Sequence, residues 1–159
     1  MCNKEWGAIT YPHVPSVAMN KYRKAFFKND ADRFNLFIES VKKGETKINA
    51  SAIFPHDLVK KLYMNRFGTS TQEEKAIEVQ WDALPNYMGD SDERIIALCD
   101  VSGSMTSPDY LPMSVSIALG IYVAQHNKGV FENAVMTFTD IPKMYYLKGL
   151  SLKQKMNGS

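Results

Sequence analysis

A strand-like run, a polar loop and a long apolar helix follow one another in the C-terminal part of this chain, and together they leave few possible folds. Residues 94–99 read Arg-Ile-Ile-Ala-Leu-Cys, and a continuous apolar run of this length is typical of a central parallel strand buried on both faces. A polar loop at residues 100–109 follows, and Pro112 then begins a long apolar helix. Two further strands are expected at residues 133–139 and 143–147. The order strand, loop, helix, strand predicts an α/β fold with an open sheet.

The first 85 residues carry a different pattern, in which apolar residues recur at the spacing of amphipathic helices. Four helices are expected there. Ser16 and Asp30 are the expected N-caps of the first two. Pro55 suits the first position of the third, and Thr69-Ser70-Thr71 before Glu73 resembles a capping box at the start of the fourth. The break before Asp30 predicts a helical hairpin, and four consecutive helices fit a fragment of a helical repeat.

Each expected helix has an apolar face that we predict to be buried. These faces consist of Val17, Met19, Tyr22, Ala25 and Phe26; Phe34, Phe37, Ile38 and Val41; Leu58, Val59, Leu62 and Tyr63; and Ala76, Ile77 and Trp81. We therefore predict an α/β protein with three parts: a helical-repeat-like segment at residues 1–85, a linker at 86–93 and an open-sheet domain at 94–159.

The composition limits the class of protein. The chain has 159 residues, of which 45% are hydrophobic and 23% charged, and this is ordinary for a globular protein. No apolar run reaches the roughly 18–20 residues that cross a bilayer, and the N-terminus lacks the basic-then-apolar layout of a signal peptide. We expect a cytoplasmic protein in which Cys2 and Cys99 are free thiols, with Cys99 packed at the end of its strand.

The charge is unevenly distributed, although the formal net charge is only +2. Residues 1–66 contain twelve Lys and Arg against six Asp and Glu, whereas residues 67–94 contain two against seven. A basic N-terminal part invites an anionic partner such as RNA, and the alternative is a solvated helical surface. The best candidates for phosphate contacts are Lys21, Arg23, Lys24, Lys28, Lys42, Lys43 and Lys47.

The residues with the clearest chemistry are Asp100, Ser102 and Ser104, in the loop after the first strand. In an extended loop, alternate residues point the same way, so these side chains can direct their oxygens to one point. One carboxylate and two hydroxyls are hard donors that suit Mg²⁺ or Mn²⁺ rather than zinc. Gly103 permits a tight turn, and open α/β sheets bind ligands beyond the carboxyl ends of their strands. The alternative is a strand-to-helix turn with polar caps.

Residues 96–105, which contain Asp100-Val101-Ser102-Gly103-Ser104, resemble the first strand and metal-ion-dependent adhesion site of a von Willebrand factor A domain. The signature of that site is Asp-x-Ser-x-Ser. Residues 14–19, 47–52 and 54–56 resemble a family that couples a Ro-autoantigen-like (TROVE-like) helical region to a C-terminal von Willebrand A domain. The resemblance covers nearly the whole chain.

The resemblance implies a Rossmann-like sheet domain that holds a divalent cation, with an open coordination position for an acidic group of a partner. It also implies that the helical region binds small structured RNA. In the resembled site a Thr and an Asp from two later loops complete the metal shell, and neither is matched before Ser159; we expect Asp140 to be a turn residue. The chain is thus expected to be a partial member, with weak metal binding and an unpaired sheet edge through which copies could associate.

Three functions follow as hypotheses. The first is a non-enzymatic binding module with a Mg²⁺-binding loop and an RNA or ribonucleoprotein partner. The second is a metal-dependent protein-interaction module, and the third is a truncated piece with a vestigial metal site that acts by self-association. An enzyme is not expected, because the sequence has no phosphate-binding Gly-rich loop with Lys, no Gly-x-Ser-x-Gly and no acid/base pair, and its three histidines stand apart.

Overall fold

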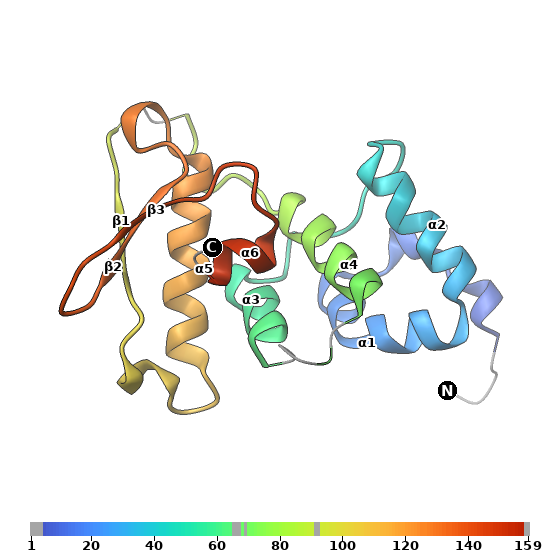
Figure 1. Cartoon of the computed structure of the whole chain (residues 1–159). Coiled ribbons are helices and arrows are strands. Elements are labelled where there is room, and N and C mark those ends of the chain that lie inside the picture. The colour runs from blue at the N-terminus through green and yellow to red at the C-terminus, as the bar shows by residue number, and fades with distance from the viewer. Residues whose placement is uncertain (1–4, 65–67, 69, 91–92, 158–159) are drawn as a thin grey trace. The chain divides into compact units, whose positions relative to one another are not determined.

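The computed structural model describes residues 5–64, 68, 70–90 and 93–157, which fall into two compact units. Each unit is formed from two stretches of the chain (Figure 1). The helical unit consists of residues 1–53 and 68–85, and the sheet unit consists of residues 54–67 and 86–159. The fold is therefore mixed α/β.

Three α-helices build the described part of the helical unit: α1 (Ser16–Asn29), α2 (Ala31–Lys42) and α4 (Thr71–Asp82). Each packs against the other two, and α1 and α2 form the predicted hairpin with one residue between them (Figure 1). Two short 3₁₀ turns, at Trp6–Ala8 and Tyr11–His13, precede α1.

An aromatic cluster forms the centre of the helical unit. The Tyr11 ring is 4% exposed, and its centroid lies 5.4 Å from that of Phe26, 4.9 Å from Phe34 and 5.6 Å from Phe37. Such ring pairs stabilise a core beyond the area that they bury. Tyr11 precedes the first helix that the sequence predicts. The Tyr11 hydroxyl, however, donates a hydrogen bond to Asp30 Oδ2 at 2.7 Å, which ties the 3₁₀ turn to the start of α2.

The capping-box prediction for α4 is confirmed. The Glu73 amide donates to Ser70 Oγ at 3.3 Å, and the Ser70 amide donates to Glu73 Oε2 at 3.2 Å. The two reciprocal bonds satisfy N–H groups that the first turn of a helix leaves without intrahelical partners.

The prediction of Ser16 as an N-cap is wrong, whereas Asp30 is the N-cap residue of α2 as predicted, although its side chain makes no capping hydrogen bond. Ser16 is the first residue of α1 and is buried, and its hydroxyl accepts a hydrogen bond from the Ala52 amide at 3.2 Å. Asp30 does precede α2, but its carboxylate accepts from the Tyr11 hydroxyl and from Arg33 Nη1, the latter at 2.9 Å. Both side chains thus make hydrogen bonds other than the expected capping bonds.

The buried face of α1 is more polar than its apolar spacing predicts. Met19 and Phe26 are buried as expected, but Val17 is 55% exposed and Tyr22 is 38% exposed. Arg23 lies in the interior instead, with 4% of its surface exposed. The buried face of α1 is therefore rotated away from Val17 and Tyr22.

Arg23 lies in a polar cluster of the helical unit, which we define as Arg23 with Glu73 and Gln80 of α4. All three side chains are buried. Arg23 Nε and Nη1 have no hydrogen-bond partner among the described atoms, whereas Gln80 Nε2 donates to the Ser16 carbonyl at 2.9 Å. Burial lowers the pKa of the Arg23 guanidinium to about 10, and the attraction of the Glu73 carboxylate opposes that shift.

The sheet unit contains a three-stranded sheet, among the described residues, in the order β1-β2-β3. The strands are β1 (Ala97–Asp100), β2 (Ala134–Phe138) and β3 (Met144–Tyr146). β1 and β2 are parallel and are joined through α5 (Leu111–His126), and β3 runs antiparallel to β2. The predicted helix and the two predicted later strands are therefore confirmed, with bounds within two residues of those expected.

The prediction that the first strand is central and buried on both faces is wrong. β1 is the edge strand of the described sheet, and it begins at Ala97 rather than at residue 94. Leu98 is 57% exposed, and on the same face Phe138 is 59% and Tyr146 64% exposed. The physical reason is that α5 packs on the opposite face, where Cys99 is buried, whereas Leu98 lies on the outer face.

Two more helices complete the sheet unit: α3 (Pro55–Met64), with Pro55 at its first position as predicted, and the short α6 (Leu152–Asn157). Both pack on α5 (Figure 1). The expected division assigns α3 to the N-terminal segment, whereas its contacts place residues 54–67 in the sheet unit.

No helix in the described residues is both long and apolar enough to span a membrane.

Candidate functional site

The candidate site is the loop that follows β1. The Ser102 amide donates a hydrogen bond to Asp100 Oδ1 at 2.9 Å, and the Ser102 and Ser104 hydroxyl oxygens lie 3.0 Å apart. The structure therefore brings together all three residues that the sequence singles out. Ser102 and Ser104 are exposed, and Asp100 at the end of the strand is partly exposed, so the cluster is open to solvent.

The way in which the loop gathers these oxygens differs from the prediction. The sequence argument assumes an extended loop through Ser104, but residues Gly103–Thr106 form a 3₁₀ turn. The Met105 amide donates to the Ser102 carbonyl at 3.0 Å, and Thr106 Oγ1 donates to the Gly103 carbonyl at 2.7 Å. The hydroxyls converge because the chain curls back after Ser102, and these internal bonds hold that turn.

Hydrogen bonding within the loop keeps Asp100 charged. The Ser102 backbone amide, followed by the Ser102 side chain, holds the pKa of the Asp100 carboxyl below its usual range. The loop therefore presents a carboxylate, rather than a carboxylic acid, at neutral pH.

The donor set fits a weakly held hard cation. Asp100, Ser102 and Ser104 would supply one carboxylate and two hydroxyl oxygens, which are ligands that Mg²⁺ and Mn²⁺ accept together with water. Within residues 5–64, 68, 70–90 and 93–157, no cluster of three or more His, Cys, Asp or Glu side chains is placed to hold a metal ion. A cation at this loop would therefore rely on neutral hydroxyls for most of its protein ligands.

The neighbouring strand ends at the same edge of the sheet. Because Asp100 pairs in register with Phe138 of parallel β2, the residues after β2 leave the sheet beside the candidate loop. Thr139 and Asp140 are both exposed there, and Thr139 Oγ1 donates to the Ile141 carbonyl at 2.8 Å, which is a turn contact. This position agrees with the expectation that Asp140 belongs to a turn.

The predicted RNA contacts lie in the helical unit. All six lysines are exposed: Lys21, Lys24, Lys28, Lys42, Lys43 and Lys47. Arg23 departs from the prediction, because its guanidinium is buried in the polar cluster and cannot reach a phosphate in this structure. The signal that could have warned of this was its spacing, since Arg23 lies four residues after Met19 and three before Phe26, in the buried stripe of α1.

Comparison with known proteins finds two family models and a relative, none of which has a described activity. Residues 1–93 match the model of a domain of unknown function, DUF2828, and residues 94–158 match that of another, DUF7788. An uncharacterized protein of Acanthamoeba polyphaga mimivirus is 34% identical over 98% of this chain, which spans only 28% of the viral protein. No solved structure matches. Since the first of these models covers more than half of its residues, the chain belongs to the DUF2828 family.

Proposed function

We propose that this chain is a non-catalytic binding module whose loop of Asp100, Ser102 and Ser104 holds Mg²⁺ or Mn²⁺. The observation that supports the proposal is the gathering of three hard oxygen donors at the carboxyl end of β1, with Asp100 ionised. A bound cation would supply a positive charge with free coordination positions, and an acidic group of a partner could occupy one of them.

Calorimetric titration of Mg²⁺ and Mn²⁺ into the full chain tests this proposal. We expect saturable one-site binding that is lost in Asp100→Ala. Asp109→Asn is the matched control, because Asp109 is exposed in the same loop and has a φ of 53°, a conformation that Asn tolerates well. Loss of binding in both variants, or in neither, would contradict a site built on Asp100.

The exposed lysines support RNA as the partner of the helical unit. Lys21, Lys24 and Lys28 lie on α1, and Lys42, Lys43 and Lys47 lie at or after the end of α2. A surface that neutralises phosphates releases counterions, so its affinity falls steeply as salt rises. Arg23 is not part of this proposed surface.

Filter binding of a structured RNA hairpin at several salt concentrations tests the RNA proposal. Replacing Lys21, Lys24 and Lys28 by Gln is expected to weaken binding and to reduce the salt slope, since each lost phosphate contact lowers that slope by about one. Arg94, Lys143 and Lys148, all exposed in the sheet unit and likewise replaced by Gln, serve as the matched control set of three charges. Equal effects of the two sets would show that RNA binding depends on the overall positive charge of the chain and not on this surface.

Two further outcomes identify the competing functions. A protein partner that is lost both on chelation and in Asp100→Ala, with no RNA affinity, would favour a metal-dependent protein-interaction module. Self-association that persists in a chelator would favour a vestigial metal site and contact through the sheet, in which β1 is the edge strand of the described residues and Leu98 is exposed.

A further inference from the structure

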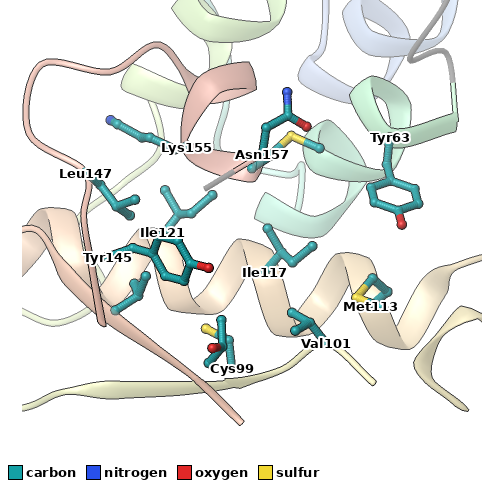
Figure 2. A pocket seen from close by; sticks show the side chains of 13 residues that line it. Tyr63, Cys99, Val101, Met113, Ile117, Ile121, Tyr145, Leu147, Lys155 and Asn157 are labelled. Carbon is teal, nitrogen blue, oxygen red and sulfur yellow. The ribbon is translucent and has the colours of Figure 1, made fainter. Parts of the chain in front are cut away.

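The free side of β1 is a place where another strand can join the sheet. Among the described residues β1 pairs with β2 on one side only. A strand that is paired on one side directs every second backbone N–H and C=O group away from its partner, and these groups can pair with a further strand. The inner face of the sheet is already packed, since Cys99 and Tyr145 line the same space as Ile117 and Ile121 of α5 (Figure 2). A strand can therefore be added at the β1 edge while α5 stays in place.

The sequence around β1 is complementary to itself when two copies run in opposite directions about Ala97. That pairing places Arg94 opposite Asp100 of the second copy, and Ile96 opposite its Leu98. Directly opposed residues of an antiparallel pair project from the same face, so each charge meets an opposite charge and each large apolar side chain meets another. A register shifted by two residues would place Asp100 opposite Ile96, or Arg94 opposite Leu98.

The side chains that this register would bring together are accessible. Arg94 is exposed and Leu98 is 57% exposed, and Ile96 and Asp100 are partly exposed. Residues 94–96 precede β1 without regular secondary structure, so pairing would extend the strand back to Arg94. The edge therefore offers a second copy both backbone groups and matched side chains.

We propose that two copies of this chain associate by antiparallel pairing of their β1 edges, with Ala97 on the two-fold axis. A second copy is the preferred occupant because the complementarity is between the strand and itself. Symmetry makes the pair of Arg94 and Asp100 occur twice. The paired segment is short compared with a standard interface, so we expect a dissociation constant on the order of 10–100 µM.

This dimer goes beyond the proposed function and meets it at Asp100. A divalent cation held by Asp100 would stand beside the position of Arg94 of the second copy, and the two positive charges would repel each other. The association should therefore be strongest in a chelator and should weaken when Mn²⁺ is added. A vestigial metal site would leave self-association the same in both conditions.

Sedimentation equilibrium of the full chain in EDTA, over a range of about 5–500 µM, tests the pairing by charge reversal. Arg94→Glu and Asp100→Arg should each weaken dimerisation at least about tenfold, because each creates two pairs of like charges. The double variant should return to within about threefold of the unchanged chain. Lys143→Glu is the matched control, because Lys143 is exposed between β2 and β3 and the change in charge equals that of Arg94→Glu.

Three results would each overturn the proposal: a chain that stays monomeric throughout this range, a double variant that dimerises no better than the single variants, or an equal loss in Lys143→Glu. A second reversal would not repair a misfolded single variant, so recovery in the double variant reports pairing rather than folding. Because EDTA removes divalent cations, a failure of the proposed metal site would leave these outcomes unchanged.

Discussion

Asp100 is the residue on which the proposed metal site depends, and its own loop holds it in the charged form. The Ser102 amide is the first cause of its lowered pKa, and an amide cannot be removed by changing the Ser102 side chain. Ser102→Ala should therefore remove one ligand while leaving the carboxylate ionised.

The pH dependence of Mn²⁺ binding should reflect the lowered pKa of Asp100. Protonation competes with metal for the carboxylate, so affinity falls as pH drops through the pKa of the free group. Because that pKa is below the ordinary value of about 3.9, we expect the affinity to stay constant between pH 7 and pH 5. Calorimetry at four pH values measures this. A loss of affinity between pH 7 and pH 5 would mean that a group other than Asp100 holds the ion.

For single residues, the sequence predicts which side chains gather at the candidate site but not the turn that brings them together. Asp100, Ser102 and Ser104 are close enough in the chain for spacing alone to bring them together. The spacing of Arg23 from Met19 and Phe26 places it in the buried stripe of α1, but the Glu73 charge that faces it comes from α4, far along the chain, and no local pattern in α1 could establish that contact.

Contact between α5 and β1 depends on Gly120. A Cβ at position 120 would overlap the Cys99 sulfur, so the helix can come this close only because the residue is glycine. Gly120→Ala should lower the free energy of unfolding by about 1–3 kcal/mol. In a Cys99→Ala background, where the sulfur is absent, the same change should be neutral or stabilising by up to about 1 kcal/mol, because Ala favours helix. Urea denaturation of the four proteins measures this, and equal losses in both backgrounds would exclude the steric account.

Within the polar cluster, Arg23 of α1 and Glu73 of α4 attract each other by charge. Glu73→Gln keeps a capping-box acceptor but leaves Arg23 without its opposing charge, and it should cost about 3 kcal/mol of unfolding free energy. Adding Arg23→Met should recover part of that loss, because the unpaired guanidinium is then absent. Denaturant unfolding of the unchanged chain, the two single variants and the double variant completes a double-mutant cycle. Strictly additive losses would show that the two charges do not interact.

The sequence predicts helices and strands well where the pattern that marks them lies within the element itself. The capping box of α4, the proline at the start of α3 and the long apolar run of α5 all mark elements that the structure contains. The exposure of β1 could not be read from its apolar sequence, because burial of a strand depends on which elements cover its two faces. The short helix α6 has too few residues for a periodic pattern and was missed.

At the scale of the whole molecule, the folding units cross the boundary between the two matched family models. α3 lies within residues 1–93 but packs on α5, which lies within residues 94–158. A fragment of residues 1–93 should therefore expose the face of α3 that contacts α5. We expect amide hydrogen exchange in residues 55–64 to be at least tenfold faster in the fragment than in the full chain, with α2 as the internal reference. Equal protection of these residues in both would contradict this assignment of α3.

The central claim, that the loop after β1 holds a divalent cation, is tested most directly by Mn²⁺-induced line broadening in an amide NMR spectrum of the full chain. The account predicts that the signals of residues 101–105 disappear first, at substoichiometric Mn²⁺, and that Asp100→Ala restores them while Asp109→Asn does not. Broadening that is centred elsewhere, or that is unchanged in Asp100→Ala, would contradict a metal site built from Asp100, Ser102 and Ser104.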